Sequence, residues 1–428
     1  MSINNNNNDS PNGGVKIWQQ CTNAECTAKY GIDRIIGKCE QCGSGLEYTF
    51  EGQWDGVPSD RDDLWKNFPM IPLQNEENIV ALGAGGSELL LLEELSGELN
   101  GANFYLKLDC FKNPTGTFKD REASIIMSRV KELGLDNLVF YSTGNTGRAY
   151  THFAAHLNLN SYFFMPRQCQ YKNTTFIKKN PGNRIILVDD HYPKISPYAK
   201  KFAQENGLTT IAPLHDRNES YATVAYEQRQ QLPECHYFAQ TIASGMGPIG
   251  FYKGHMNMVQ LGLETKEDIP TLIGIQSSQV NVMARAYNSG RTTLTPDDMP
   301  PDFPEDLFEP TLNSTNPVNN YPQLHQCLQE NNGIITDVEP EFTGEKAQAL
   351  VAALEKRGIT LRTDVERSLL IGYSGLVKLA GEGKFQKGEN IMLLAVGRGK
   401  DDCTELIEPD AVINPQNQDP VELFKKLN

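Results

Sequence analysis

Residues 113–121 place a lysine, Lys119, between a tight Pro/Gly turn and an amphipathic helix; they read Asn-Pro-Thr-Gly-Thr-Phe-Lys-Asp-Arg. The dipole at a helix N-terminus disfavours an ammonium group, so it lowers the pKa of a lysine placed there. The free amine can then form a Schiff base with an aldehyde cofactor. Phe118 could lie against a flat ring, and Asn145, on a second Gly-bounded turn, could hydrogen-bond that ring. Together the two turns predict pyridoxal 5′-phosphate (PLP) as the cofactor.

Two turns have the composition of anion-binding sites. Residues 142–147 read Ser-Thr-Gly-Asn-Thr-Gly between a predicted strand and a predicted helix. Hydroxyls and backbone N–H groups that converge at a helix N-terminus suit an anion such as an amino-acid carboxylate. Residues 244–248 read Ser-Gly-Met-Gly-Pro, also between a strand and a helix, and glycines there let the backbone cradle a phosphate. This turn lacks the Lys-Ser/Thr pair of a nucleotide-binding loop.

Four cysteines near the N-terminus have the spacing C-x4-C-x12-C-x2-C: Cys21, Cys26, Cys39 and Cys42. Four thiolates on two short turns suit tetrahedral zinc, and such a site is structural because no ligand position stays open. The alternative is a small cap that contains free cysteines. The total of nine cysteines is odd and favours a reducing cytoplasm over a disulfide framework.

The length and charge of the chain limit its partners. With 428 residues it should hold two or three domains, and its net charge of −15 repels the phosphate backbone of nucleic acids. An anionic substrate would therefore need a local cluster of cations. The start of the chain, with an asparagine run at 4–8, has no apolar signal segment, and residues 1–14 are expected to form a disordered tail. The apolar runs are too short to span a membrane, which favours a cytoplasmic protein.

Hydrophobic periodicity predicts alternating strands and helices from residue 116 to residue 274 and again after residue 334. The expected strands are 137–141, 161–165, 184–188, 209–212, 236–242, 271–275, 334–338 and 391–396. The expected helices are 118–133, 147–157, 221–232, 345–356 and 366–380. Residues 291–322, which are rich in proline, are expected to form an irregular surface loop. This rhythm indicates an α/β fold with parallel sheets covered by helices on both faces.

The order of these segments resembles the fold-type II PLP enzymes, and the threonine synthase family in particular. Residues 113–121 match the family segment N-P-[ST]-G-[ST]-F-K-D-R, and residues 142–149 match S-x-G-N-T-x-x-A. Segments 217–227, 244–254 and 397–401 are similar in the same order, and several family members carry an N-terminal four-cysteine zinc ribbon. The resemblance implies a fold like that of the tryptophan synthase β subunit, with two three-layer αβα domains, and a homodimer. The expected parts are a zinc-ribbon-like segment at 15–50, a large PLP-binding domain at 51–135 plus 206–428, and a small mobile domain at 136–205.

The resemblance also implies roles for single residues. Lys119 would hold PLP and later move protons, Phe118 would contact the ring, and Asn145 would bond the ring oxygen. The backbone of Gly245, Met246 and Gly247 would bind the cofactor phosphate, and Val396 would lie in the slot beside the pyridine nitrogen. The substrate-binding residues would be Ser142, Thr143, Asn145, Thr146 and Arg148. Lys112, Arg148 and Arg217 are candidates for a cationic pocket around a leaving group.

The chain departs from the family pattern at three places. Glu122 stands where the family usually has glycine, and Arg148 is unusual for threonine synthase. Residues 396–399 read Val-Gly-Arg-Gly where the family usually has T-G-x-G. Val396 therefore replaces a hydroxyl residue, and valine cannot hydrogen-bond the ring nitrogen. An arginine at position 148 is a feature that resembles cysteate synthase. Its guanidinium could bind a phosphate or sulfonate group bidentately. The alternative is that Arg148 is an exposed helix arginine.

The resemblance implies that O-phosphohomoserine and water give threonine and phosphate. The alternative is β-replacement on O-phosphoserine with sulfite or another nucleophile, as in cysteate synthase. A further alternative is an inactive scaffold with the same fold, which only Val396 supports.

Overall fold

The computed structural model describes residues 14–174, 178–190, 192–211, 214–299, 307–309, 312, 317–360, 366–397 and 405–428. The predicted tail lies outside these residues except for Gly14, and Arg398, Gly399 and part of the predicted loop 291–322 lie outside them as well. No helix in these ranges combines the length and the apolar character that crossing a bilayer requires.

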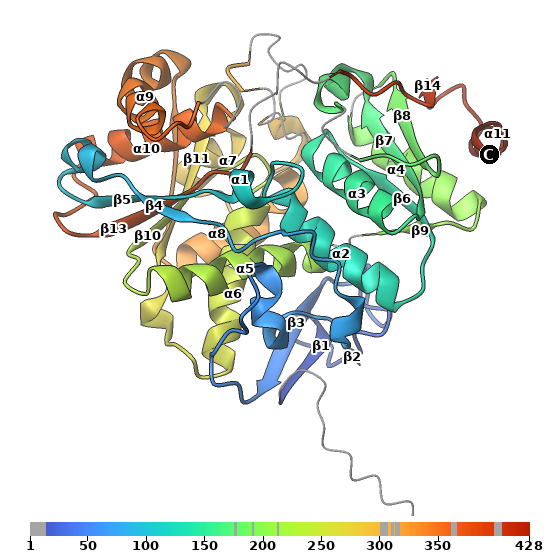
Figure 1. The fold of residues 1–428 in the computed structure, drawn as a ribbon, viewed down its shortest axis with the longest axis horizontal. Helices are drawn as coiled ribbons and strands as arrows, with labels where there is room; N and C mark the ends of the chain where they lie inside the picture. Colours follow the sequence, from blue (N-terminus) through green and yellow to red (C-terminus); the bar gives the residue numbers. More distant parts are fainter. Residues whose placement is uncertain are drawn as a thin grey trace, which may run out of the picture.

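A six-stranded sheet forms the centre of the larger layered unit (Figure 1). Its order is β12 (Ile334–Val338), β11 (Thr271–Ser277), β10 (Tyr237–Thr241), β13 (Asn390–Leu394), β5 (Asn103–Lys107) and β4 (Leu89–Leu91). All neighbours are parallel except the antiparallel pair of β4 and β5.

Side chains that alternate along these strands build two cores, one on each face of the sheet. Phe238 of β10 packs with α5 (Leu214–Gln231), α6 (Met246–Gln260), α7 (Val282–Asn288) and α8 (Tyr321–Glu330). Its neighbour Ala239 packs on the other face with α9 (Pro340–Glu355) and α10 (Ser368–Gly381). The result is three layers, as the strand period of two requires.

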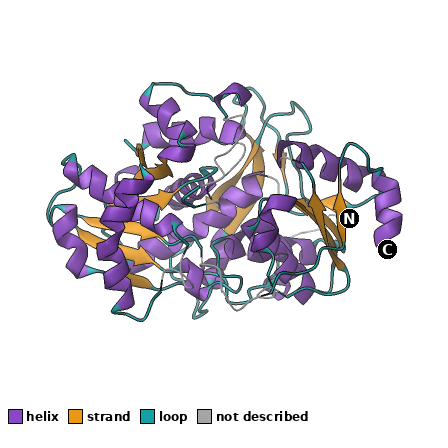
Figure 2. Ribbon diagram, turned by 90° about the horizontal axis from the view of Figure 1, so that it is seen from above, coloured by secondary structure: helices purple, strands orange, loops and turns teal. Residues whose placement is uncertain are grey.

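A five-stranded parallel sheet forms the second layered unit. Its order is β14 (Ala411–Ile413), β8 (Asn183–Val188), β7 (Asn160–Pro166), β6 (Asn137–Tyr141) and β9 (Thr209–Thr210). One face packs against α2 (Lys119–Glu132) and α3 (Asn145–His156), and the other against α4 (Tyr192–Glu205) and α11 (Pro420–Leu427). Seen from above, helices flank the strands of both sheets (Figure 2). The predicted α/β architecture with two three-layer units is confirmed.

The range predicted as a small mobile domain, 136–205, supplies β6, β7 and β8 of the second sheet. Two further strands of this sheet, β9 and β14, lie outside that range. The chain returns at its C-terminus so that β14 pairs with β8 and α11 covers the adjacent face. A three-residue strand carries too little periodicity to be recognised in a sequence.

Several helices and strands differ in length from the prediction. Helix α5 begins at Leu214 rather than at residue 221, because His215, Asp216, Asn218 and Glu219 are polar yet buried and so hide the helical pattern. Strand β13 ends at Leu394 rather than at Val396. There the chain leaves the ladder: the carbonyl of Val396 accepts from the backbone N–H of Phe118 at 3.0 Å. The described part of 291–322 contains short 3-10 turns, Pro296–Asp298 and Pro317–Asn319, and the start of α8.

Three antiparallel strands form a separate N-terminal ribbon below α2, α5 and α6 (Figure 1). Strand β1 (Val15–Cys21) lies between β2 (Lys29–Tyr30) and β3 (Leu46–Gly52). The ribbon is joined to the body by buried polar contacts: the hydroxyl of Tyr48 donates to Asp216 at 2.5 Å and accepts from Arg129 at 2.6 Å.

Candidate active site

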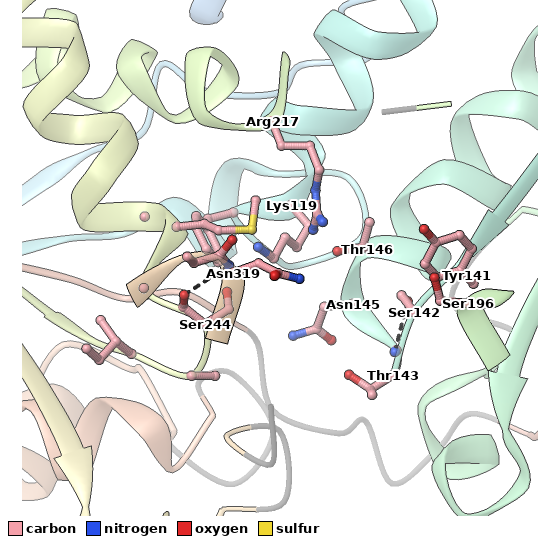
Figure 3. A pocket seen from close by; sticks show the side chains of 18 of the residues that line it. Lys119, Tyr141, Ser142, Thr143, Asn145, Thr146, Ser196, Arg217, Ser244 and Asn319 are labelled. Atoms are coloured by element: carbon pink, nitrogen blue, oxygen red, sulfur yellow. Dashed lines mark hydrogen bonds between the residues drawn. The ribbon is translucent and has the colours of Figure 1, made fainter. Parts of the chain in front are cut away.

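A cavity of about 780 Å³ lies between the two layered units, where loops follow the carboxyl ends of β6 and β10. Ligands of parallel α/β sheets bind at this end of the strands, and the volume falls within the range of roughly 300–1,000 Å³ for small-molecule sites. Figure 3 shows Lys119 and Arg217 reaching into this space from one side, and Ser142, Thr143 and Asn145 lying across from them.

The segment before α2 is a rigid frame that holds Lys119 at the cavity. The side-chain oxygen of Asn113 accepts from the N–H of Gly85 at 2.8 Å, and its amide nitrogen donates to the carbonyl of Thr117 at 2.9 Å. The carboxylate of Asp120 accepts from the backbone and hydroxyl of Thr115 at 2.9 and 2.8 Å. These contacts fix the turn on both sides of the lysine, so the polar residues of 113–121 act mainly as its support.

Arg121 anchors the same frame in a buried ion cluster. Its guanidinium donates to Asp109 at 2.7 Å and to Glu227 at 2.8 Å, and Lys107 donates to Glu227 at 2.7 Å. All four side chains are 0% exposed. Removing one partner of such a cluster leaves a buried charge uncompensated, so the cluster ties the start of α2 to β5 and α5.

Lys119 has the environment of a reactive amine. Its Nζ donates to the hydroxyl of Tyr221 at 2.6 Å and lies 4.3 Å from the ring centre of Phe118. Burial lowers the pKa of Lys119 to about 7, and the charge of Arg217 lowers it too, while Glu122 and Glu366 oppose the shift. A large fraction of the amine is therefore neutral near pH 7, as attack on an aldehyde requires.

The turn after β6 brings the predicted substrate-binding residues to the cavity wall. Ser142, Thr143, Asn145 and Thr146 all line it. The hydroxyl oxygen of Ser142 accepts from the N–H of Gly144 at 3.1 Å and from that of Gly147 at 2.9 Å, which leaves its proton available for an acceptor. A side chain at Gly147 would overlap the ring of Phe163, so this turn requires glycine there.

The turn after β10 fits the phosphate of PLP. Gly245 has φ +78°, and the residues Gly245, Met246 and Gly247 line the cavity where α6 begins. A Cβ at Gly247 would overlap the side-chain oxygen of Gln240, and one at Gly245 would lie 2.8 Å from Leu324. The backbone N–H groups of the first turn of a helix have no helical acceptor and can bind an anion. With Lys119 across the cavity, the residues present fit this cofactor.

Two predicted cations do not line the cavity. Lys112 pairs with Asp62 at 2.5 Å, and Arg148 donates to the carbonyl of Thr115 at 3.2 Å. Arg148 is half-buried, so the alternative of an exposed helix arginine is wrong, and its binding of an anion stays a prediction. Arg217 does line the cavity, together with Lys38, Lys172 and Lys200, which the sequence analysis missed. They come from the ribbon and from residues 167–217, and no motif in the sequence links them.

The slot predicted beside the ring nitrogen contains Val396, which lines the cavity and is 9% exposed. A carboxylate that the sequence analysis missed, Glu366, lies nearby and accepts from the side-chain amide of Asn145 at 3.0 Å. Burial and the negative charge of Glu309 raise the pKa of Glu366 to about 7. Its position two residues before α10 carries no sequence signal of a site.

The four predicted zinc ligands converge in the ribbon. The ligand atoms of Cys21, Cys26, Cys39 and Cys42 all lie within 4.8 Å of one another. The sulfur atoms of Cys21 and Cys42 are 3.4 Å apart, and those of Cys26 and Cys39 are 3.7 Å apart. Four sulfur atoms at such separations fit one tetrahedral zinc ion.

Comparison with known proteins agrees with this geometry. A family model described as "Pyridoxal-phosphate dependent enzyme" matches residues 80–395. A threonine synthase from Methanocaldococcus jannaschii is 26% identical over 426 residues, which cover 96% of this chain and 98% of the relative. A cysteate synthase from Methanosarcina barkeri is 26% identical over 423 residues, with 89% and 97% covered. Among solved structures, maize serine racemase has a TM-score of 0.56 and 17% identity over 74% of this chain and 90% of its own. These likenesses confirm the fold-type II prediction.

Proposed function

Because the chain belongs to the family of pyridoxal-phosphate dependent enzymes, we propose that it is a synthase for a phosphorylated amino acid. The proposed reaction converts O-phosphohomoserine and water to threonine and phosphate. Relatives named threonine synthase match 83–96% of this chain, which supports the proposal.

The cation content of the cavity carries the proposal. Among the residues that the structure describes, the lining contains the Lys119 amine, four further basic side chains and the carboxylate of Glu366; the four are Lys38, Lys172, Lys200 and Arg217. The whole chain has a net charge of −15, so this local excess of positive charge runs against its composition. A substrate that carries a carboxylate and a phosphate explains such a cavity, because charge-assisted hydrogen bonds hold both groups.

Each wall of the cavity would serve one part of the chemistry. The backbone of Gly245, Met246 and Gly247 would hold PLP by its phosphate, and the bound cofactor would supply an electron sink for the substrate Cα. Lys119 would hold the cofactor aldehyde at rest and take the proton from Cα during turnover. Ser142, Thr143 and Thr146 would receive the substrate carboxylate, and Arg217 and Lys200 would face the leaving phosphate.

The second candidate is β-replacement on O-phosphoserine with sulfite or a similar nucleophile. Relatives named cysteate synthase, which are 24–26% identical to this chain, support it. Arg148 adds no further support, because it is not among the residues that line the cavity and one of its guanidinium nitrogens donates to the carbonyl of Thr115 at 3.2 Å.

A phosphate-release assay with purified, PLP-loaded protein tests both candidates. O-phosphohomoserine and O-phosphoserine are compared, each with and without sulfite. Phosphate release from the first with formation of threonine supports the proposed reaction, and sulfite-stimulated release from the second favours the alternative. If neither substrate releases phosphate while the cofactor is bound, both assignments are refuted.

Paired lysine variants test the phosphate pocket. Lys200→Ala should raise KM by roughly 10–100-fold, because a hydrogen bond to a charged group contributes about 1.5–3 kcal/mol. Lys112→Ala is the matched control, since Lys112 pairs with Asp62 away from the lining. Equal effects of the two variants would contradict the proposed pocket.

Three further parts belong to the same proposal. The four cysteines would hold a structural zinc ion, the range 136–205 would move as a small domain when substrate binds, and two chains would form a homodimer.

A further inference from the structure

A buried carboxylate lies behind the Lys119 amine, at the position where the related family segment has glycine. Glu122 is 0% exposed and accepts from Arg217 at 2.6 Å and from the hydroxyl of Tyr150 at 2.5 Å. It also accepts from the hydroxyl of Tyr221. Its nearest oxygen lies 4.0 Å from Lys119 Nζ, so Glu122 reaches the amine mainly through Tyr221.

Tyr221 thus stands between a base and a carboxylate in one hydrogen-bonded line. Lys119 donates to its hydroxyl oxygen at 2.6 Å, and the hydroxyl proton is donated onward to Glu122. The Tyr221 ring is 1% exposed and stacks on Phe118 with ring centres 4.8 Å apart, which holds the hydroxyl in place. A hydroxyl needed only for packing would not require an amine on one side and a carboxylate on the other.

We propose that Tyr221 is a catalytic residue that stabilises the protonated Lys119 amine, and that Glu122 is the positioning residue that orients Tyr221 and balances the charge. The inference rests on the proposed function, in which Lys119 takes a proton from the substrate. As the Cα–H bond breaks and an N–H bond forms, the new ammonium donates to Tyr221. The phenol keeps its own proton, which remains shared with Glu122. Lys119 later returns the proton to carbon by the reverse transfer, in which the N–H bond breaks and a C–H bond forms.

The groups that face Lys119 explain why such support is needed. Burial disfavours the ammonium, and Arg217 on α5 adds a like charge, while Glu122 on α2 and Glu366 before α10 favour the ammonium. Burial tends to raise the pKa of Glu122, but Arg217, Lys119 and the two tyrosines outweigh burial and lower it. Glu122 is therefore ionised at neutral pH and supplies a steady negative charge. Without Tyr221 or this charge, the amine would be a weaker proton acceptor.

Three variants separate this role from a structural one. Tyr221→Phe removes the group that contacts Lys119, and Glu122→Gln removes the charge but keeps an acceptor. Tyr150→Phe is the matched control, because Tyr150 is equally buried at 1% exposed and also donates to Glu122. Its hydroxyl is bonded to Glu122 from α3 rather than to the lysine.

The measurement is the pH dependence of PLP attachment to cofactor-free protein. The Schiff base is trapped with borohydride, and modified Lys119 is counted by peptide mass spectrometry between pH 5 and 9. We expect the midpoint to fall by about one pH unit, a tenfold change in proton affinity, in Tyr221→Phe and Glu122→Gln. The midpoint of Tyr150→Phe should stay at the wild-type value. Melting temperatures of all three variants report on folding separately.

Unchanged midpoints in Tyr221→Phe and Glu122→Gln, or equal shifts in all three variants, would overturn the inference. If Tyr221→Phe does not fold, Glu122→Gln decides alone, because glutamine preserves the size of the side chain. Trapping elsewhere in the Lys119→Ala protein would instead contradict the attachment site itself. Attachment at Lys119 without phosphate release from either substrate would refute the proposed reaction and leave the midpoint test intact.

Discussion

Replacing Arg121 by alanine should be the most damaging single change in the frame that holds Lys119. The guanidinium makes bonds of 2.7 Å to both oxygens of Asp109 and bonds of 2.8 Å to both oxygens of Glu227. Without it, the two buried carboxylates would keep neutral donors, the Ser87 hydroxyl for Asp109 and the Gly86 N–H for Glu227, and Lys107 would pair with Glu227 alone. Breaking a buried pair costs about 3–5 kcal/mol, a large part of the roughly 5–15 kcal/mol that stabilises a domain.

Equilibrium urea unfolding at pH 7.5 measures this loss for Arg121→Ala. Tryptophan fluorescence is a suitable probe because Trp65 is buried and its indole N–H donates to Ser124 of α2 at 2.8 Å. The matched control is Arg357→Ala, which removes a bidentate arginine from Glu94 in a pair whose side chains are 31% and 34% exposed. Partly exposed pairs contribute about 0–1 kcal/mol, so the free energy of unfolding of the control should stay close to that of the wild type.

The stability that Arg121→Ala loses should also depend on pH, in a direction that the pKa of Glu227 determines. Burial tends to raise the pKa of Glu227, but Arg121 and Lys107 outweigh it and hold the pKa far below its ordinary value. Glu227 therefore contributes stability above the ordinary glutamate pKa of about 4.3, and this stability is lost as the pH falls further. The difference in free energy of unfolding between the wild type and Arg121→Ala should therefore become smaller at acid pH. A loss below about 1 kcal/mol at pH 7.5, or a gap that widens in acid, would refute the argument.

Three further outcomes are expected. Gly247→Ala should weaken PLP binding about 10–100-fold in a fluorescence titration, because overpacking costs about 1–3 kcal/mol. Gly344→Ala is the control and should leave PLP binding unchanged, because the space around Gly344 is open. Glu366→Gln should stabilise the protein at pH 8 by up to about 3 kcal/mol, because its raised folded pKa of about 7 makes ionisation costly, and the gain should vanish below pH 4.5; a gain at pH 4 would contradict this. Metal analysis should find one zinc ion per chain that Cys39→Ser removes and Cys235→Ser retains, and zinc-free wild type would refute the ribbon site.

The site residues that lie on turns could be predicted from the sequence, because each turn is formed by residues that are close together in the chain. Lys119, Asn145 and Gly245 each lie at the end of one strand or the start of one helix, and parallel strands bring such turns to one edge of a sheet. The strands and helices themselves followed from hydrophobic alternation, as at β6, where the predicted and observed bounds agree. The exceptions were short strands such as β14 and the polar start of α5, where burial comes from other parts of the chain.

The sequence by itself therefore determined the fold class, the lysine and the glycine-rich turns, because short-range patterns encode them. Only the tertiary structure decided the partners that set the charge of the site. Tyr221 meets Lys119 across 102 positions and Glu366 meets Asn145 across 221, and no spacing rule links such pairs. It likewise placed Arg148 against Thr115 and Arg217 against Glu122. Packing in three dimensions selects among distant side chains, and the burial that shifts the pKa of Lys119 exists only once that packing is complete.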